Sequence, residues 1–243
     1  MKQPNSCKSL QIRLTTCAKE IAEKTKCMKI GPPEAMWQLK VYGQLDECVD
    51  EFCYLGSIIT NTGSCDKEVK TRISKANSAF KRLDDIWRQK CLGLPMKIRL
   101  YKSLVLAILL YCAETWPVTE ANRKRLEGLH HNYLRRILNI IMERQSKGQV
   151  CQEKDRSVIA RMYIPKRRLR WFGHVQRVEN VSRARQALHW IPAEKRKRGR
   201  PRITWRDTVM KDISQMNATW DGICQTAMYR QEWRVWTTQC ASH

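Results

Sequence analysis

The chain has 243 residues, of which 42% are hydrophobic, enough for a folded core and too many for a wholly disordered protein. Its formal net charge is +23, from 46 Lys and Arg against 23 Asp and Glu. The longest apolar run, Leu104–Ala113, is shorter than the ~20 residues of a membrane span, and Met1–Leu10 lacks the apolar centre of a signal peptide. We therefore expect a nuclear or cytoplasmic protein, not secreted and without a membrane partner.

Positive charge increases along the chain. The net charge is +1 over residues 1–60, +5 over residues 61–120 and +17 over residues 121–243. Charge concentrated toward one end is typical of proteins that bind polyanions, whereas charge that serves solubility is spread evenly. The gradient predicts nucleic acid as the partner.

The eleven cysteines do not form a metal-binding pattern. Their number is odd, and no two are spaced as Cys-x-x-Cys. Cys240 and His243 come nearest to a zinc site, with Cys224 as a third ligand, but a closed structural site needs four ligands. We expect free thiols in a reducing compartment, no metal and no cofactor.

Short strands are predicted before residue 61. Cys27–Ile30 ends at the loop signal Gly31–Pro33. Phe52–Thr60 is rich in strand-forming residues and is predicted to be one strand that ends in a turn at Asn61–Gly63. Residues 1–63 should therefore hold a small β-hairpin remnant.

Three helices are predicted between residues 64 and 142. Ser64 is an N-cap for the first, and Thr119 for the third. The second, Pro95–Trp116, is apolar around its centre and should be the most buried element. Apolar residues recur at helical spacing in the first and third helices: Val69, Ile73, Ala76, Phe80, Leu83 and Trp87, then Leu126, Leu129, Tyr133, Ile137 and Ile140.

Helices are also predicted beyond residue 142. Residues 143–154 suit a linker, and a short helix near Asp155–Tyr163 should stop before Pro165. One helix should follow with Trp205 and Val209 on its apolar face, and another should run from Thr219 to about Trp236. The predicted fold class is mainly α, with four regions: 1–63, 64–142, 143–190 and 191–243.

A dense basic cluster lies at Lys195–Arg202. Its cations are Lys195, Arg196, Lys197, Arg198, Arg200 and Arg202. Gly199 and Pro201 favour an extended path, and the Gly-Arg-Pro core resembles that of an AT-hook. Such a strand lies in the narrow minor groove of A·T-rich DNA, which attracts inserted arginines. A nuclear-import signal and a solvated charge run remain open as alternatives.

Cations and aromatic residues also mix over Arg167–Val175. Trp171 lies among Arg168 and Arg170, and we predict that these three residues contact nucleic acid, with Trp171 available to stack on a base. The other tryptophans of the last third have helical spacing with aliphatic residues, which favours core packing.

Two other constellations favour structural roles. Asp84-Asp85 is the one Asp-Asp pair of the sequence, but it lies on the periodic first helix, where neighbouring side chains point about 100° apart. A salt-paired helix face is expected there, not a metal pair. His130, His131 and His174 have no carboxylate at metal-ligand spacing, so packing roles are expected for them.

Four stretches form a further pattern in chain order. They are Glu23-Lys24-Thr25-Lys26 with Cys27-Met28, then Phe52 with Tyr54-Leu55-Gly56-Ser57, then Tyr111–Trp116, and finally Arg167–Val175 with Arg198–Arg202 and Trp205-Arg206-Asp207. Together they resemble the C-terminal part of the reverse transcriptase of non-LTR (LINE-type) retrotransposons. The likeness is nearest to the RTE-like and Jockey-like endonuclease–reverse transcriptases and spans about residues 20–236.

The resemblance implies a primer-grip strand at Tyr54, Leu55 and Gly56, a thumb-like helical bundle at 64–142, and a basic segment beyond it. The partner would be RNA, DNA or a hybrid duplex. Polymerases of this family hold two metal ions with aspartates, and the residues before Glu23 contain no Asp. We therefore expect a catalytically inactive fragment, not an enzyme, with residual non-sequence-specific nucleic-acid binding. A host-adopted A·T-rich DNA-binding protein and a non-functional pseudogene product are the alternatives; the oligomeric state is not indicated.

Overall fold

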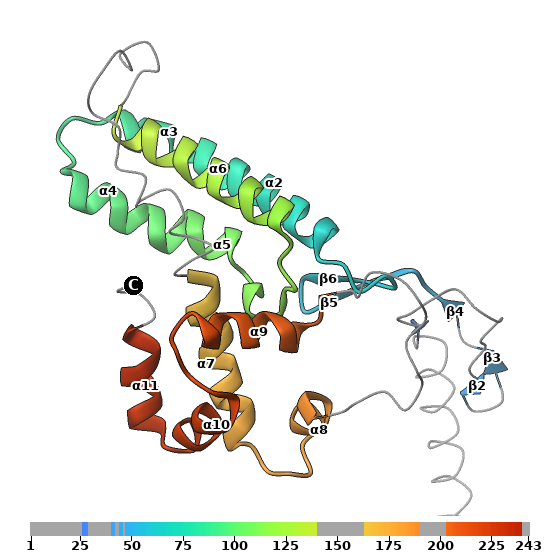
Figure 1. Ribbon diagram of the computed structural model, residues 1–243. Helices are drawn as coiled ribbons and strands as arrows, with labels where there is room; N and C mark the ends of the chain where they lie inside the picture. Colours follow the sequence, from blue (N-terminus) through green and yellow to red (C-terminus); the bar gives the residue numbers. More distant parts are fainter. Residues whose placement is uncertain are drawn as a thin grey trace, which may run out of the picture. The chain divides into compact units, whose positions relative to one another are not determined.

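The computed structural model describes residues 26–28, 40–41, 44–45, 47–139, 163–189 and 203–239 (Figure 1). This part of the chain is mainly helical with a few short strands, which confirms the predicted fold class. The chain divides into two compact units, Met1–Glu68 and Val69–His243.

The described strands all lie in the first unit. They are β1 (Lys26–Cys27), β2 (Lys40–Val41), β3 (Gln44–Leu45), β4 (Glu47–Cys48), β5 (Glu51–Tyr54) and β6 (Ser57–Thr60). β1 pairs with β4 in parallel, while β2 pairs with β3 and β5 with β6 in antiparallel fashion. The β5–β6 pair is the longest, and Glu68 anchors it by accepting a hydrogen bond from the Ile58 N–H at 2.8 Å.

The prediction of one strand over Phe52–Thr60 was wrong, because the segment folds back on itself between β5 and β6. Leu55 and Gly56 form the turn, with φ of 47° and 80°. A two-residue hairpin turn requires such left-handed conformations, and Leu at the first position gave no sequence signal for one. The turn predicted at Asn61–Gly63 is confirmed by a hydrogen bond of 2.9 Å from the Gly63 N–H to the Thr60 carbonyl.

The second unit contains most of α2 (Asp66–Arg82), then α3 (Asp84–Arg88) and α6 (Glu120–Ile137). Figure 1 shows α2 and α6 side by side, and Tyr133 joins them by donating a hydrogen bond to Asn77 at 2.7 Å. The Phe80 ring stacks on Tyr133 at 4.2 Å and on Trp87 at 5.1 Å between centroids. The predicted apolar stripe of the first helix therefore faces the core.

Both predicted N-caps are confirmed. The Ser64 hydroxyl accepts a hydrogen bond from the Asp66 N–H at 3.1 Å, and the Thr119 hydroxyl accepts one from the Asn122 N–H at 3.3 Å. Each hydroxyl satisfies a donor that the first helical turn leaves free.

The helix predicted at Pro95–Trp116 is segmented and ends earlier. α4 (Leu94–Leu100) continues into a π-helical turn, η1 (Tyr101–Leu106), and into α5 (Ala107–Leu109). Cys112 then has a left-handed φ of 59°, which ends the run, and a 3₁₀ turn, η2 (Ala113–Thr115), follows. The run is buried on one face only: the exposed fractions of Leu104 and Tyr111 are 44% and 41%.

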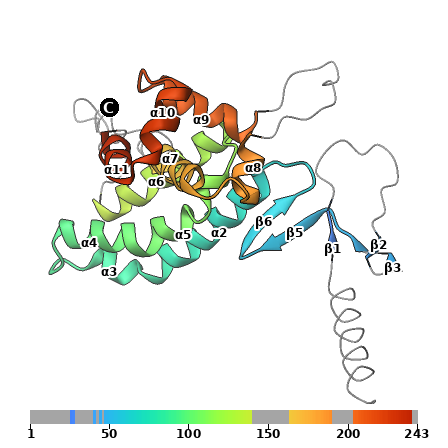
Figure 2. The same cartoon turned by 90° about the horizontal axis from the view of Figure 1, so that it is seen from below.

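The C-terminal helices pack around α7 (Ile164–Arg177). They are α8 (Arg183–His189), α9 (Trp205–Ser214), α10 (Trp220–Met228) and α11 (Arg230–Gln239) (Figure 2). Residues 155–162, over which a short helix was predicted, lie outside the described residues. Pro165 lies in the first turn of α7. A proline fits the first turn because no intrahelical partner awaits its missing N–H.

The helices predicted around Trp205 and beyond Thr219 are present, the second as two pieces. Thr204 and Asp207 form a capping box at the start of α9. Tyr229 has an extended ψ of 103° and separates α10 from α11. The break lets Trp233 on α11 pack against α7, where its indole N–H donates to the Leu169 carbonyl at 3.1 Å.

Side chains of α7 and α9 donate hydrogen bonds to backbone carbonyls in the segment that follows α5. Arg167 donates to the Leu110 carbonyl at 2.8 Å, Trp205 to the Glu114 carbonyl at 2.7 Å, and Arg168 to the Trp116 carbonyl at 3.4 Å. Buried carbonyls need such partners. Residues from the predicted regions 64–142, 143–190 and 191–243 are thus joined within one unit.

Candidate nucleic-acid interface

The basic strand Lys195–Arg202 lies outside the described residues. Its cations, Lys195, Arg196, Lys197, Arg198, Arg200 and Arg202, therefore remain a prediction from the sequence. The remaining predicted residues fall on α7 and on the β5–β6 hairpin.

Arg168 does not fit its predicted role as a nucleic-acid contact. Only 4% of the residue is exposed, and its guanidinium donates to the Asp212 carboxylate at 2.6 Å. Burial raises the pKa of the Asp212 carboxyl, and Arg168 acts against that rise. The sequence could not distinguish Arg168 from its neighbours, because its burial depends on which face of α7 meets α9.

Arg170 and Trp171 do lie on the surface. The exposed fraction of Trp171 is 40%, and its ring centroid lies 5.3 Å from that of His174, one helical turn further along α7. The helical period separates these residues from Phe172, which is fully buried. Of the three predicted contacts on α7, the structure therefore places Arg170 and Trp171 together on the surface, and it adds His174 beside them.

Tyr54, Leu55 and Gly56 occupy the end of the β5–β6 hairpin. The exposed fractions of Tyr54 and Leu55 are 59% and 74%. Their predicted primer-grip role stays a prediction, since a hairpin turn by itself fits many roles.

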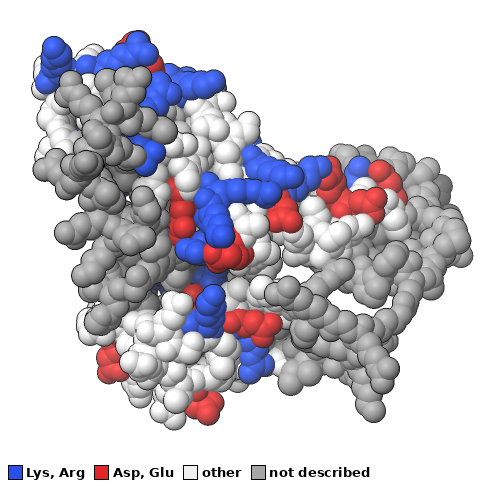
Figure 3. Space-filling model, turned by 45° about the horizontal axis from the view of Figure 1, so that its top comes forward, with Lys and Arg blue, Asp and Glu red and all other residues white. Residues whose placement is uncertain are grey.

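A basic groove along α2 was not predicted. It has a volume of about 460 Å³ and contains no acidic side chain; its lining residues are Arg72, Ser74, Lys75, Ser78, Ala79, Arg82 and Ile108. Arg72 lies with its guanidinium 4.3 Å from the centre of the Tyr111 ring. We call this site the α2 groove. Figure 3 shows Lys and Arg gathered along the top of the helical unit.

The signal for the α2 groove was present in the sequence. Arg72, Lys75, Ala79 and Arg82 recur at helical spacing, along one side of the apolar stripe of the same helix. What the sequence lacked was the wall that Ile108 of α5 contributes from another helix.

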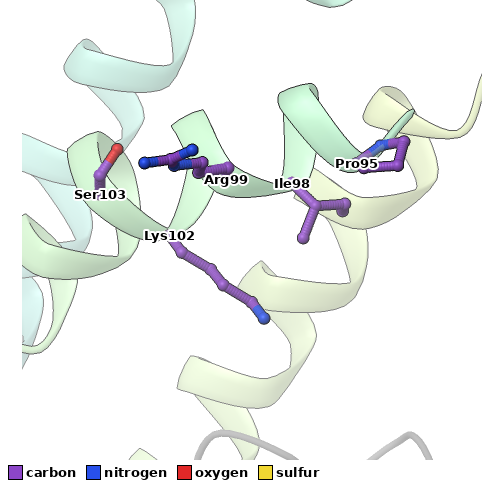
Figure 4. A pocket seen from close by; sticks show the side chains of 5 residues that line it. All are labelled: Pro95, Ile98, Arg99, Lys102 and Ser103. Carbon is purple, nitrogen blue, oxygen red and sulfur yellow. The ribbon is translucent and has the colours of Figure 1, made fainter. Parts of the chain in front are cut away.

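A second hollow of about 440 Å³ lies on α4 and η1, lined by Pro95, Ile98, Arg99, Lys102 and Ser103 (Figure 4). In Figure 4, Lys102 extends to a different side of the helix from Arg99 and Ser103. Because its two cations diverge, this hollow suits one phosphate less well than the α2 groove.

Asp84 and Asp85 take the expected place on a helix face, in the first turn of α3. The Asp84 carboxylate is bonded by Arg88 and by Arg136, each at 2.6 Å. In the described ranges, no group of three or more His, Cys, Asp or Glu side chains could hold a metal ion. None of the helices in those ranges has the length and hydropathy to cross a membrane.

His130 has the packing role expected of it. Its Nδ1 lies 2.6 Å from the Tyr101 hydroxyl in the core. Burial lowers the pKa of His130 to about 4, with smaller effects from His131 and Lys102, and burial raises the pKa of Tyr101. The imidazole is therefore neutral in the core, where it shares a hydrogen bond with the tyrosine hydroxyl.

Protein stability should consequently fall in mild acid. Between pH 6.5, the ordinary pKa of histidine, and the folded pKa of about 4, the unfolded chain takes up a proton at this site before the folded chain does. The free energy of unfolding should drop across this window by about 3 kcal/mol. Urea unfolding at several pH values should show a smaller drop for His130→Gln, while His189→Gln, which removes an exposed histidine, should behave as the wild type. Equal pH profiles for all three proteins would contradict the assignment.

Comparison with known proteins gives one informative similarity. No family model and no solved structure matches the chain. The chain is 28% identical over 203 residues to an uncharacterized transposon-derived protein of Caenorhabditis elegans, covering 79% of this chain and 70% of that protein. The similarity indicates an origin from a transposon.

Proposed function

We propose that this chain binds nucleic acid through its phosphate backbone, without reading sequence, and that the α2 groove is the main contact within the described residues. The observation that carries the proposal is that the exposed cations Lys75 and Arg82 line one hollow that no carboxylate lines. Exposed cations of this kind can replace the counterions of a polyanion.

The spacing of these two cations suits a nucleic-acid backbone. From Lys75 to Arg82 the axis of α2 rises by ~10 Å, whereas double-stranded DNA carries one charge per ~1.7 Å of its own axis. The groove can therefore reach more than one phosphate. Ser74 and Ser78 add hydroxyl groups of the kind that position a backbone without specifying bases.

We further propose that the chain is a remnant of a LINE-type reverse transcriptase and does not polymerise nucleotides. The similarity to a transposon-derived protein supports an origin from a transposon. The four sequence stretches that occur in the same order as in LINE-type reverse transcriptases support the assignment to that class. The single Asp-Asp pair of the sequence supports the loss of polymerisation, because Arg88 and Arg136 bond one of its two carboxylates.

Salt dependence of binding tests the α2 groove. Changing Lys75 and Arg82 to Ala should weaken binding to duplexes of any sequence and reduce the slope of log affinity against log salt by ~0.9 for each lost phosphate contact. A charge-matched control is Arg230→Ala with Arg234→Ala on α11, which should leave the slope nearly unchanged. Equal effects of the two double variants would contradict the assignment to the groove, and no binding by the wild type would contradict the function.

The basic strand is the second candidate, and its Arg-rich Gly-Arg-Pro sequence favours it. If it dominates, the wild type should prefer A·T-rich to G·C-rich duplexes, because a narrow minor groove attracts arginines. Changing Arg198, Arg200 and Arg202 to Ala should then abolish the preference. If that preference is lost while the variant with Lys75 and Arg82 changed to Ala binds as the wild type does, the basic strand and not the α2 groove is the main contact.

A further inference from the structure

α7 presents two different faces. Leu169, Phe172 and Val175 are buried in the C-terminal core, whereas Arg170 and His174 are exposed and Trp171 is 40% exposed. Trp233, which packs against the same helix, is only 2% exposed. Core packing therefore explains Phe172 and Trp233 but leaves much of the Trp171 indole in contact with solvent.

The exposed aromatic residues form a pair. The ring centroids of Trp171 and His174 lie 5.3 Å apart, and their planes are inclined by 35°. The spacing of three residues places both rings on the same side of α7. Two neighbouring flat surfaces on a rigid helix give an incoming ring a fixed place to stack.

Charge on α7 is also divided between the two faces. Arg168 bonds Asp212, Arg167 bonds the Leu110 carbonyl, and Arg177 bonds the Ala227 carbonyl at 2.5 Å. Within the described ranges, Arg170 has no acidic partner, and α7 itself contains no Asp or Glu. The guanidinium next to Trp171 is thus available to an anion outside the fold.

We infer that Trp171, His174 and Arg170 form a stacking site for an unpaired base, so that this face of α7 takes single-stranded nucleic acid. The inference rests on the proposed function, since it requires the chain to engage nucleic acid. An unpaired base offers its aromatic face to Trp171, while bases in a duplex are already stacked on each other. Arg170 binds the phosphate beside the stacked base.

Binding to three strands of equal length tests the site: an oligothymidylate, an oligouridylate and a DNA strand of abasic nucleotides. Trp171→Ala should weaken binding of the two base-bearing strands by roughly 5- to 150-fold, the range for one base–aromatic stack. Its affinity for the abasic strand should equal that of the wild type, because the phosphate contacts persist. A loss on one of the base-bearing strands alone would identify that strand, DNA or RNA, as the source of the base.

Two controls keep the result interpretable. Trp171→Phe should retain most of the affinity, and Tyr229→Ala, which removes an aromatic residue that is 65% exposed elsewhere, should retain all of it. An equal loss on the abasic strand, or no loss on either base-bearing strand, would overturn the stacking site. A wild type that binds neither duplex nor single strand would instead overturn the proposed function.

Discussion

Gly173→Ala should lower the free energy of unfolding by roughly 2–5 kcal/mol, because it adds one methyl group where the core has no room. A Cβ on Gly173 would lie 2.0 Å from the indole nitrogen of Trp233. That indole is 2% exposed and donates to the Leu169 carbonyl, so it cannot move away without losing its hydrogen bond. Urea unfolding followed by circular dichroism would measure the change.

Gly128 on α6 provides the matched control. A Cβ there would meet no atom within 4 Å, so Gly128→Ala should stabilise the protein by about 0.5–1 kcal/mol through helix propensity alone. In a Trp233→Leu background, the cost of Gly173→Ala should shrink, since the ring that collides is gone. Similar costs in both backgrounds would show that the collision is not the cause.

Arg168→Met should lower the free energy of unfolding by about 3–5 kcal/mol, since it leaves the Asp212 carboxylate buried without its cation. The same change removes the hydrogen bond to the Trp116 carbonyl. Arg170→Ala, two residues further along α7 on the exposed face, should have little effect on stability. Equal effects of the two variants would contradict the division of α7 into a buried and an exposed face.

Replacing both partners should recover much of the loss. Among the described residues, the Arg168 Nε is buried without a hydrogen-bond partner, so the pair is not fully satisfied even in the wild type. Arg168→Met with Asp212→Leu removes both charges, and such replacements of buried pairs are often neutral or stabilising. A double variant no more stable than Arg168→Met would show that the loss comes from packing and not from the unpaired charge.

The cost of Arg168→Met should also depend on pH. Without the guanidinium, the pKa of Asp212 should rise further above its ordinary value of 3.8. A carboxyl whose pKa is higher in the folded than in the unfolded state stabilises the folded state at low pH. That contribution to the free energy of unfolding is lost as the pH rises through the pKa of the folded state. The stability gap between the variant and the wild type should therefore narrow as the pH falls from 7 towards 4, and Asp212→Leu should abolish that dependence.

The candidate interface was only partly predictable. The exposure of Trp171 followed from its cationic neighbours, but Arg168 has the same neighbours and is buried. Side-chain type says that a residue can bind a phosphate; it does not say which face of a helix is covered. The α2 groove was missed for a related reason, since its wall comes from α5, far along the sequence from Lys75.

The sequence by itself determined the mainly helical class, the caps at Ser64 and Thr119 and the inward stripe with Phe80, because these depend on residues within a few turns of one another. Only the tertiary structure decided where the helix after Pro95 ends. Its last carbonyls are bonded by Arg167, Arg168 and Trp205 from segments far away in the sequence. The same applies to Gly173, whose lack of a side chain matters because Trp233 occupies that space. Local periodicity fixes which face of a segment is apolar, but a buried polar group or a close approach needs a partner that only the folded chain supplies.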